Sequence, residues 1–207
     1  MPTSDSPSVY IPFQPEFGYE KGVALAIAYF QREGLQPIIV APNKTVLEFV
    51  PPLKSFARGR TVITPMNTGR VAGGRGNPAL IYAPELKQLE LGLEYARGNP
   101  VVVVEDASYS CERWADEAKA INLLDRKVHS VDRTAEHEEI LKAIDWAGNN
   151  GWSDAPGKRD LLRHLGKLKA HGWLDRDEII AYQLVKGRHG HYESLNRLSK
   201  LIDDFSG

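Results

Sequence analysis

Four short apolar runs, each followed by a polar or proline-containing turn and then by a helical pattern, constrain the fold of this chain more than any other feature. The runs are QPIIVAPNK, RTVITPMN, PALIYAPE and PVVVVEDAS, which end near Asn43, Asn67, Glu85 and Ser108. Uninterrupted Val and Ile residues are typical of strands buried on both faces, because crossover helices cover both sides of a parallel sheet. The sequence therefore predicts a three-layer α/β fold with a mostly parallel sheet.

Other segments extend this pattern toward both ends of the chain. Val9–Phe13 predicts a first strand and Lys127–Val131 a further one, so five or six strands are expected, and Ser110–Leu124 predicts a helix before the last of them. Beyond the last strand, helical periodicity continues to the end of the chain. We therefore expect an α/β domain at residues 1–132 and a helical C-terminal region at residues 133–207.

The composition limits the classes of protein to which the chain can belong. There are 26 Lys and Arg against 27 Asp and Glu, a formal net charge of -1, so no global field draws the chain onto nucleic acid or an anionic membrane. The one cysteine, Cys111, can form neither an internal disulfide nor a CxxC motif. Neither a leader pattern nor a membrane-spanning apolar run is found. We expect a cytoplasmic protein that does not contact membranes.

Asn67, at the end of the second run, is a candidate ligand contact, and a loop rich in glycine and arginine follows it. Ligands of open α/β sheets bind beyond the carboxyl ends of the strands, so residues at these ends are the first candidates for a site. Gly73 and Gly74 can turn their amides toward an anion, while Arg70 and Arg75 offer two-pronged donation to phosphate or carboxylate. The loop is thus a candidate phosphate site. A flexible surface connection would have the same composition, and neither GxGxxG nor GxxxxGK[ST] is present.

Two adjacent carboxylates, Glu105 and Asp106, end the most apolar run. They suit a magnesium ion bound with a nucleotide, a ribose hydroxyl or general-base chemistry, so both are candidate catalytic residues. Ser108 is a candidate ligand contact. The alternative is ordinary capping, in which Asp106 or Ser108 accepts hydrogen bonds from amides of the next helix. Cys111, near the start of that helix, can have a lowered pKa, but the sequence ties no histidine to it.

Asn43 and Lys44 begin the helical pattern after the first of the four runs. An amide side chain, an ammonium and backbone N–H groups at a helix start resemble an anion site in outline, so both residues are candidate ligand contacts. Such residues are also common at ordinary helix starts. The pattern continues to Arg58, but Pro51 and Pro52 remove two amide donors and must break or kink it.

The succession FGYEKGVALAIAYFQREG, LQPIIVAPNKTVLEF, RTVITPMNTGR and PVVVVEDAS resembles the first RecA-like domain of superfamily-2 helicases. Ala41-Pro42 and Thr64-Pro65 match nucleic-acid contacts of that family, and Glu105–Ser108 matches its acidic metal-binding box with the two acids reversed. Where the family has Gly-Lys-Thr, this chain has GYEKGV at Gly18–Val23, so the phosphate cradle and its hydroxyl are missing. The resemblance implies a Rossmann-like or RecA-like sheet in a degenerate relative that does not hydrolyse ATP.

The C-terminal region contains one helix, Lys158–Ala170, in which five Lys or Arg residues alternate with leucines. Its basic face can contact nucleic acid or an acidic partner, or can simply face solvent. His189 and His191 flank a glycine, but no spacing fixes a third ligand, so no metal site is predicted. Trp152 and Trp173 follow glycines at helix breaks, and we expect them to anchor the helical region on the α/β domain.

These observations lead to two functional hypotheses. In the first, the protein binds a nucleotide-like or nucleic-acid phosphate at the carboxyl edge of the sheet without ATP hydrolysis. In the second, it is a non-catalytic interaction module with a degenerate nucleotide-binding fold, whose C-terminal helices bind a protein partner or self-associate. The missing phosphate loop and the near-neutral charge favour the second hypothesis, whereas the polar residues at the strand ends favour the first.

Overall fold

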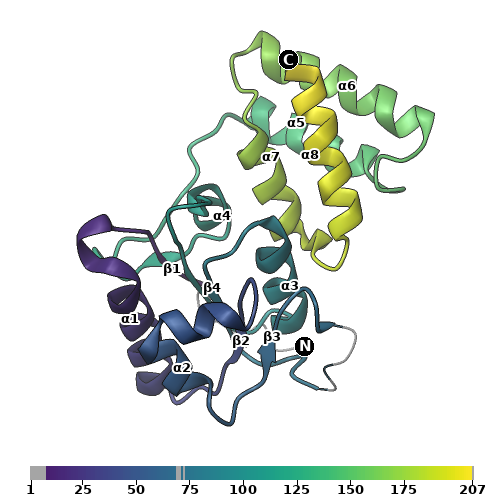
Figure 1. The fold of residues 1–207 in the computed structure, drawn as a ribbon. Helices are drawn as coiled ribbons and strands as arrows, with labels where there is room; N and C mark the ends of the chain where they lie inside the picture. The colour runs from purple at the N-terminus through teal and green to yellow at the C-terminus, as the bar shows by residue number, and fades with distance from the viewer. Residues whose placement is uncertain (1–7, 69–70, 72, 207) are drawn as a thin grey trace. The chain divides into compact units, whose positions relative to one another are not determined.

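The structure is a computed structural model that describes residues 8–68, 71 and 73–206. Contacts within the chain divide it into two compact units, Met1–Ser130 and Val131–Gly207. The first is built on a sheet and the second consists of helices (Figure 1).

The α/β unit contains one sheet of six parallel strands, in the order β3-β2-β4-β5-β1-β6. The strands are β1 (Val9–Ile11), β2 (Ile38–Val40), β3 (Val62–Ile63), β4 (Ala79–Tyr82), β5 (Val101–Val104) and β6 (Ile121–Asn122). β2 and β5 lie in one sheet with β4 between them, as the apolar runs predict. The prediction of an α/β fold with a parallel sheet and C-terminal helices is confirmed.

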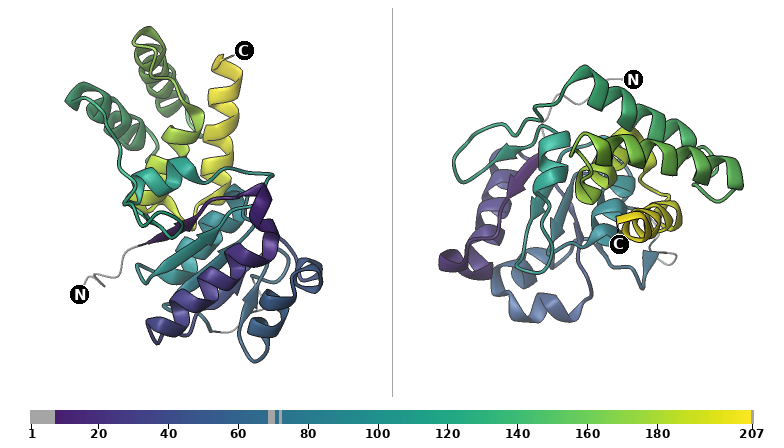
Figure 2. Two further views of the ribbon diagram at one scale, coloured as in Figure 1. Left: turned by 90° about the vertical axis from the view of Figure 1, so that its left-hand side faces the viewer. Right: turned by 90° about the horizontal axis from the view of Figure 1, so that it is seen from above.

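Short helices connect the strands on both faces of the sheet, which gives the three layers (Figure 2). They are η1 (Pro15–Phe17), α1 (Gly18–Arg32), η2 (Thr45–Phe49), α2 (Pro51–Ala57), α3 (Leu86–Ala96) and α4 (Glu112–Glu117). The predicted break at Pro51 is confirmed, because Pro51 is the first residue of α2. A backbone N–H at this position would have no acceptor within the helix, so proline is tolerated there.

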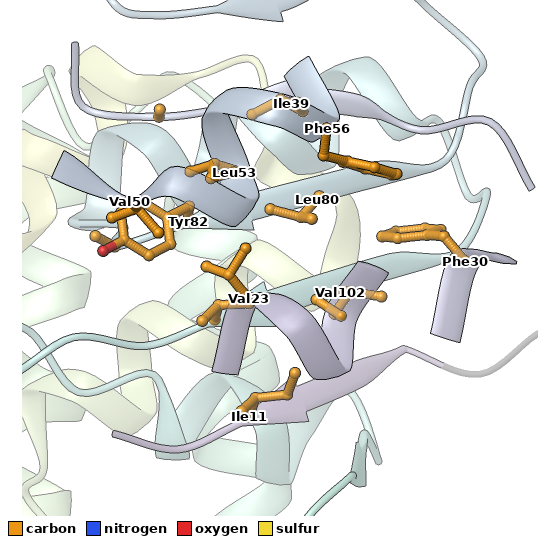
Figure 3. Close-up of a cluster of buried hydrophobic side chains, with 14 of the residues drawn as sticks. Ile11, Val23, Phe30, Ile39, Val50, Leu53, Phe56, Leu80, Tyr82 and Val102 are labelled. Carbon is orange, nitrogen blue, oxygen red and sulfur yellow. The ribbon is translucent and has the colours of Figure 1, made fainter. Parts of the chain in front are cut away.

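Side chains that alternate along the strands separate the two faces of the sheet. Leu80 and Val102 belong to the core cluster beneath α1 and α2, together with Phe30 (Figure 3). Ile81 points to the other face and meets α3 at Gly92, where an added Cβ would lie 2.2 Å from Ile81 Cδ1. The absence of a side chain at Gly92 therefore lets α3 pack close to β4.

The helix predicted at Ser110–Leu124 is much shorter in the structure. α4 ends because Lys119 adopts a left-handed conformation, with φ of 50°, and the Ala120 N–H donates to the Ala115 carbonyl over 2.9 Å. This is the Schellman arrangement, here without the usual glycine. The chain then forms β6 beside β1, while Val128 makes only an isolated antiparallel bridge to Ile121. The strand predicted at Lys127–Val131 was therefore placed too late in the sequence.

The second unit packs its helices around an apolar core. They are α5 (Ala135–Ala147), α6 (Ala155–Ala170), α7 (Arg176–Gln183), the π-helical turn η4 (Leu184–Arg188) and α8 (Tyr192–Ser206). Thr134, Asp154 and Asp175 accept amide hydrogen bonds at the starts of α5, α6 and α7, as N-caps do.

The two tryptophans expected to anchor this region have different surroundings. Trp152 is fully buried inside the helical unit, and its Nε1 donates to the Ile144 carbonyl over 3.2 Å. Trp173 is partly exposed and stacks on His137 and on His171, with ring centroids 4.9 and 4.3 Å away. These contacts hold the helices of the unit to one another.

Candidate functional site

The carboxyl edge of the sheet contains a point at which two neighbouring connections run in opposite directions. Because all six strands are parallel, their carboxyl ends meet at this edge. The connection after β1 leads past β5 and β4 to β2, whereas the connection after the neighbouring β5 leads past β1 to β6, so the two connections cross. Ligands of open α/β sheets bind beyond the carboxyl ends of the strands where the direction of the connections changes, so the ends of β1 and β5 are a candidate site.

Glu105 lies at this point and joins the ends of the two strands. Its Oε2 accepts a hydrogen bond from the Tyr10 hydroxyl of β1 and another from the Cys111 N–H over 2.8 Å. The Phe13 N–H approaches Oε1 at 3.4 Å. The carboxylate therefore binds donors of its own chain on three sides, which is the arrangement of a structural acceptor.

Two groups around Glu105 are held in their neutral forms. Burial, followed by the hydrogen bond to Glu105, raises the pKa of the Tyr10 hydroxyl, which stays a donor at physiological pH. Burial and the nearby carboxylates Glu105 and Asp106 raise the pKa of the Cys111 thiol, whose side chain is 1% exposed. The lowered cysteine pKa considered from the sequence is thus wrong, and Cys111 is a buried thiol without nucleophilic character.

Asp106 accepts hydrogen bonds within the tight turn after β5. Its Oδ1 accepts hydrogen bonds from the Ser108 N–H at 2.9 Å and from the Ser108 hydroxyl at 2.5 Å. Asp106 also lies close enough to Tyr82 to help burial raise the pKa of that hydroxyl to about 12, with Tyr19 contributing. Asp106 and Ser108 therefore stabilise the turn after β5, and the Asp106 carboxylate faces the end of β4.

The residues predicted after β2 and β3 also have local partners. Asn43 Oδ1 accepts from the Val46 N–H over 2.9 Å at the start of η2. Lys44 is exposed at the same place. Asn67 closes the turn after β3, since its Oδ1 accepts from the Thr64 N–H at 2.7 Å and its Nδ2 donates to the Val62 carbonyl at 3.0 Å. Both asparagines act as turn residues.

The glycine- and arginine-rich loop reaches the opposite edge of the sheet. A Cβ on Gly74 would lie 3.2 Å from Ile38 Cγ2 and 3.4 Å from Thr61 Cγ2, and these two residues stand at the amino ends of β2 and β3. Arg75 pairs with Glu94 at 2.6 Å, near the end of α3. A four-residue strand at about 3.3 Å per residue separates the two edges by roughly 10 Å.

The placement of Gly73, Gly74 and Arg75 at the carboxyl edge is therefore wrong. The physical reason is that the chain has returned to the amino edge by Gly74, which packs beside Ile38 and Thr61 before β4 begins. Arg70 lies outside the described residues. Glu105 and Asp106 follow β5 at the carboxyl edge, and Gly74 and Arg75 do not lie beside them.

The start of α1 follows β1 at the same edge. From the sequence it is identified only as the place where the phosphate loop of the helicase family is missing, and none of its residues is predicted as a candidate contact. Gly18 has φ of 61° and ψ of -179°, a conformation open only to glycine, and no side chain caps the helix. The Lys21 ammonium lies 3.5 Å from the centroid of the Phe17 ring. A glycine directly before a helical pattern, with a lysine one turn later, was the signal in the sequence.

Comparison of the chain with known protein families, with characterised proteins and with solved structures finds no match. Within residues 8–68, 71 and 73–206, no three His, Cys, Asp or Glu side chains gather as a metal site requires. In the same part of the chain, no helix is both long enough and apolar enough to cross a membrane.

Proposed function

We propose that the α/β unit binds a nucleotide-like phosphate ligand at the carboxyl edge of the sheet, between the ends of β1 and β5, without hydrolysing ATP. The observation that carries this proposal is the start of α1 beside the ends of β1 and β5, where the connections run in opposite directions. Backbone N–H groups at an uncapped helix start attract anions, and Gly18 leaves the approach open. Lys21, one turn later, adds a positive charge.

The acids at this edge favour binding over catalysis. Glu105 is engaged by three donors of the chain, so it is not free to accept a proton from a substrate in this arrangement. Magnesium in proteins is bound through one or two carboxylates together with substrate phosphates, and Asp106 is the carboxylate that remains for it. Asp106 also suits a ribose hydroxyl, since only its Oδ1 is used by Ser108.

The resemblance to the first RecA-like domain of superfamily-2 helicases is compatible with this proposal. The family binds phosphate at the start of the helix after its first strand, and our proposal assigns the phosphate to the same place in this chain. The chain lacks Gly-Lys-Thr at that place, and Lys21 lies over Phe17, which supports a ligand-binding relative without hydrolysis.

Thermal-shift titration with AMP, ADP and ATP, each with and without magnesium, tests the proposal. A ligand at a hundred times its Kd stabilises the folded state by about 2.7 kcal/mol, which raises the Tm by roughly 2–4 °C per kcal/mol in a chain of this length. We expect Lys21→Gln and Asp106→Asn to reduce the shift. Arg75→Gln is the matched control at the other edge and should leave the shift unchanged.

Absence of stabilisation by any of these nucleotides would overturn the proposal. Loss of the shift in Arg75→Gln, with a normal shift in Lys21→Gln, would move the site to the glycine-rich loop. Release of phosphate from ATP at a steady rate would contradict the absence of hydrolysis.

A second candidate function is the non-catalytic interaction module. The exposed apolar side chains of the helical unit favour it: Trp146 is 77% exposed, Leu162 43% and Val185 41%. Large exposed apolar groups are common at protein contacts. Light scattering at several protein concentrations tests self-association, which should decrease on replacement of these side chains by polar ones.

A further inference from the structure

A hollow of about 450 Å³ lies between α5 and α6 in the helical unit. The residues around it are Glu139, Lys142, Ala143, Trp146, Ala147, Asp160, Arg163 and His164. The volume lies within the range of sites that accept small organic groups. None of the residues predicted as ligand contacts from the sequence lies here, so this hollow is separate from the carboxyl edge of the sheet.

Trp146 is the aromatic side of the hollow. Its side chain is 77% exposed, although the other tryptophans of this unit take part in packing, Trp152 in the core and Trp173 between two histidine rings. A large aromatic ring that stays in solvent contributes little to the stability of the folded state, because aromatic side chains stabilise a protein mainly through burial. Trp146 therefore offers an open face to a flat partner.

The charged groups that line the hollow are paired with one another. Lys142 Nζ lies 2.9 Å from Glu139 Oε1, and Arg163 lies 3.3 Å from Asp160. His164 is 9% exposed, and burial, Arg163 and Lys167 lower its pKa, so the ring is neutral at physiological pH. Two ion pairs and a neutral imidazole give the hollow no net charge, which suits an uncharged flat group.

Further positive charge lies along α6. Arg159, Arg163 and Lys167 are spaced four residues apart, so they form a row on one face with a rise of about 6 Å between neighbours. All three are exposed, and among the described residues only Arg163 has an acidic partner. Arg163 belongs both to the hollow and to the row, which makes the two features continuous. Such a row attracts regularly spaced anions.

We propose that this surface binds single-stranded nucleic acid, with one base stacked on Trp146 in the hollow and the phosphates beside Arg159, Arg163 and Lys167. Base stacking on an exposed aromatic ring combined with cations that follow the backbone is how single strands are bound. A duplex offers no free base face, and an acidic peptide has charges but no regular flat rings. The site is independent of the one proposed at the sheet.

Fluorescence anisotropy with a labelled twelve-nucleotide oligothymidine, and with the matching oligouridine, tests the proposal on the full chain. At about 50 mM salt we expect Trp146→Ala to weaken binding about tenfold or more, and Trp146→Phe to retain most of it, as stacking predicts. The double variant Arg159→Gln and Lys167→Gln should have a less steep dependence of the logarithm of the association constant on the logarithm of the salt concentration. The magnitude of this negative slope should decrease by about 1.4.

Lys200→Gln is the control for charge, because Lys200 is an exposed cation on α8, and it should alter neither affinity nor slope. Circular dichroism confirms that each variant is folded. No binding by the wild-type chain at 50 mM salt would overturn the proposal, as would equal binding by Trp146→Ala. A polyglutamate peptide that competes as well as the oligonucleotide would assign the surface to an acidic protein partner.

Discussion

Glu105 is the residue that joins the carboxyl ends of β1 and β5. Its three donors come from β1, from the segment after β1 and from the start of α4. A buried donor left without its acceptor costs about 1–3 kcal/mol, which is more than an average hydrogen bond contributes. We therefore expect substitution of Glu105 to change the free energy of unfolding even in the absence of a ligand.

Replacing Glu105 with Gln should lower the free energy of unfolding of the α/β unit by about 1–3 kcal/mol, because the amide keeps only one acceptor oxygen. Its NH2 group then faces either the Phe13 N–H or the Tyr10 hydroxyl and the Cys111 N–H. Urea denaturation followed by far-UV circular dichroism measures the change. Asp106→Asn is the control, since its partner Ser108 is exposed, and it should cost less than about 1 kcal/mol. Equal stability of the wild type and the Glu105 variant would contradict the structural role.

His164 makes the helical unit sensitive to acid. Burial, then Arg163 and Lys167, lower its pKa in the folded state, whereas the nearby Asp160 acts in the opposite direction. The unfolded chain therefore binds more protons below the ordinary histidine pKa of about 6.5, so stability is complete above this pH and decreases as the pH falls below it.

We expect His164→Leu to reduce this loss of stability, measured as the difference in urea midpoint between pH 7.5 and pH 5.5. His191→Gln, which changes an exposed histidine before α8, should keep the wild-type difference. If the wild type and the His164 variant lose the same stability over this pH interval, His164 is not the group responsible.

At the scale of elements, the contact between α3 and β4 depends on a glycine within a helix. Gly92→Ala should destabilise the α/β unit by about 1–3 kcal/mol, because the added Cβ overlaps the Ile81 side chain at 2.2 Å. Thermal unfolding measures the effect. The double variant with Ile81→Ala should lose less stability than the sum of the losses in the two single variants, because the smaller side chain removes the overlap. Gly166→Ala in α6 is the matched control, since nothing lies within 4 Å, and alanine should stabilise that helix by about 0.5–1 kcal/mol.

At the scale of the whole molecule, each of the two units contains its own buried core. The start of the helical unit includes Arg133, whose side chain is 8% exposed and lies 3.1 Å from Glu138 and 3.0 Å from Glu178. The hydrogen bonds from Arg133 and from Tyr182 outweigh the effect of burial and lower the pKa of Glu138.

A fragment of residues 131–207 should therefore fold alone and unfold cooperatively, as followed by circular dichroism. In the same fragment, Arg133→Met leaves Glu178 without its arginine partner while Thr134 still caps α5, so this variant should be less stable by several kcal/mol, about 3–5 at most. Two fragments of equal stability would show that the ion pairs of Arg133 contribute nothing to the fold.

The sequence by itself determined the parallel sheet, the positions of most strands and helices, and the break at Pro51. These features follow from hydrophobic periodicity and from proline and glycine, whose effects extend over a few residues. Where a local signal was lacking, the prediction was wrong. α4 ends before Lys119, a left-handed residue that is not glycine, so β6 was expected as part of a helix.

Only the tertiary structure decided which polar residues meet. Tyr10 and Glu105 are 95 positions apart, and they form a hydrogen bond because the strand order places β1 beside β5. The return of the chain to the amino edge before β4 places Arg75 at the opposite edge, beside Glu94. The hollow at Trp146 likewise requires α5 and α6 to lie side by side. Such contacts depend on the arrangement of whole elements, and local patterns of residues do not contain that information.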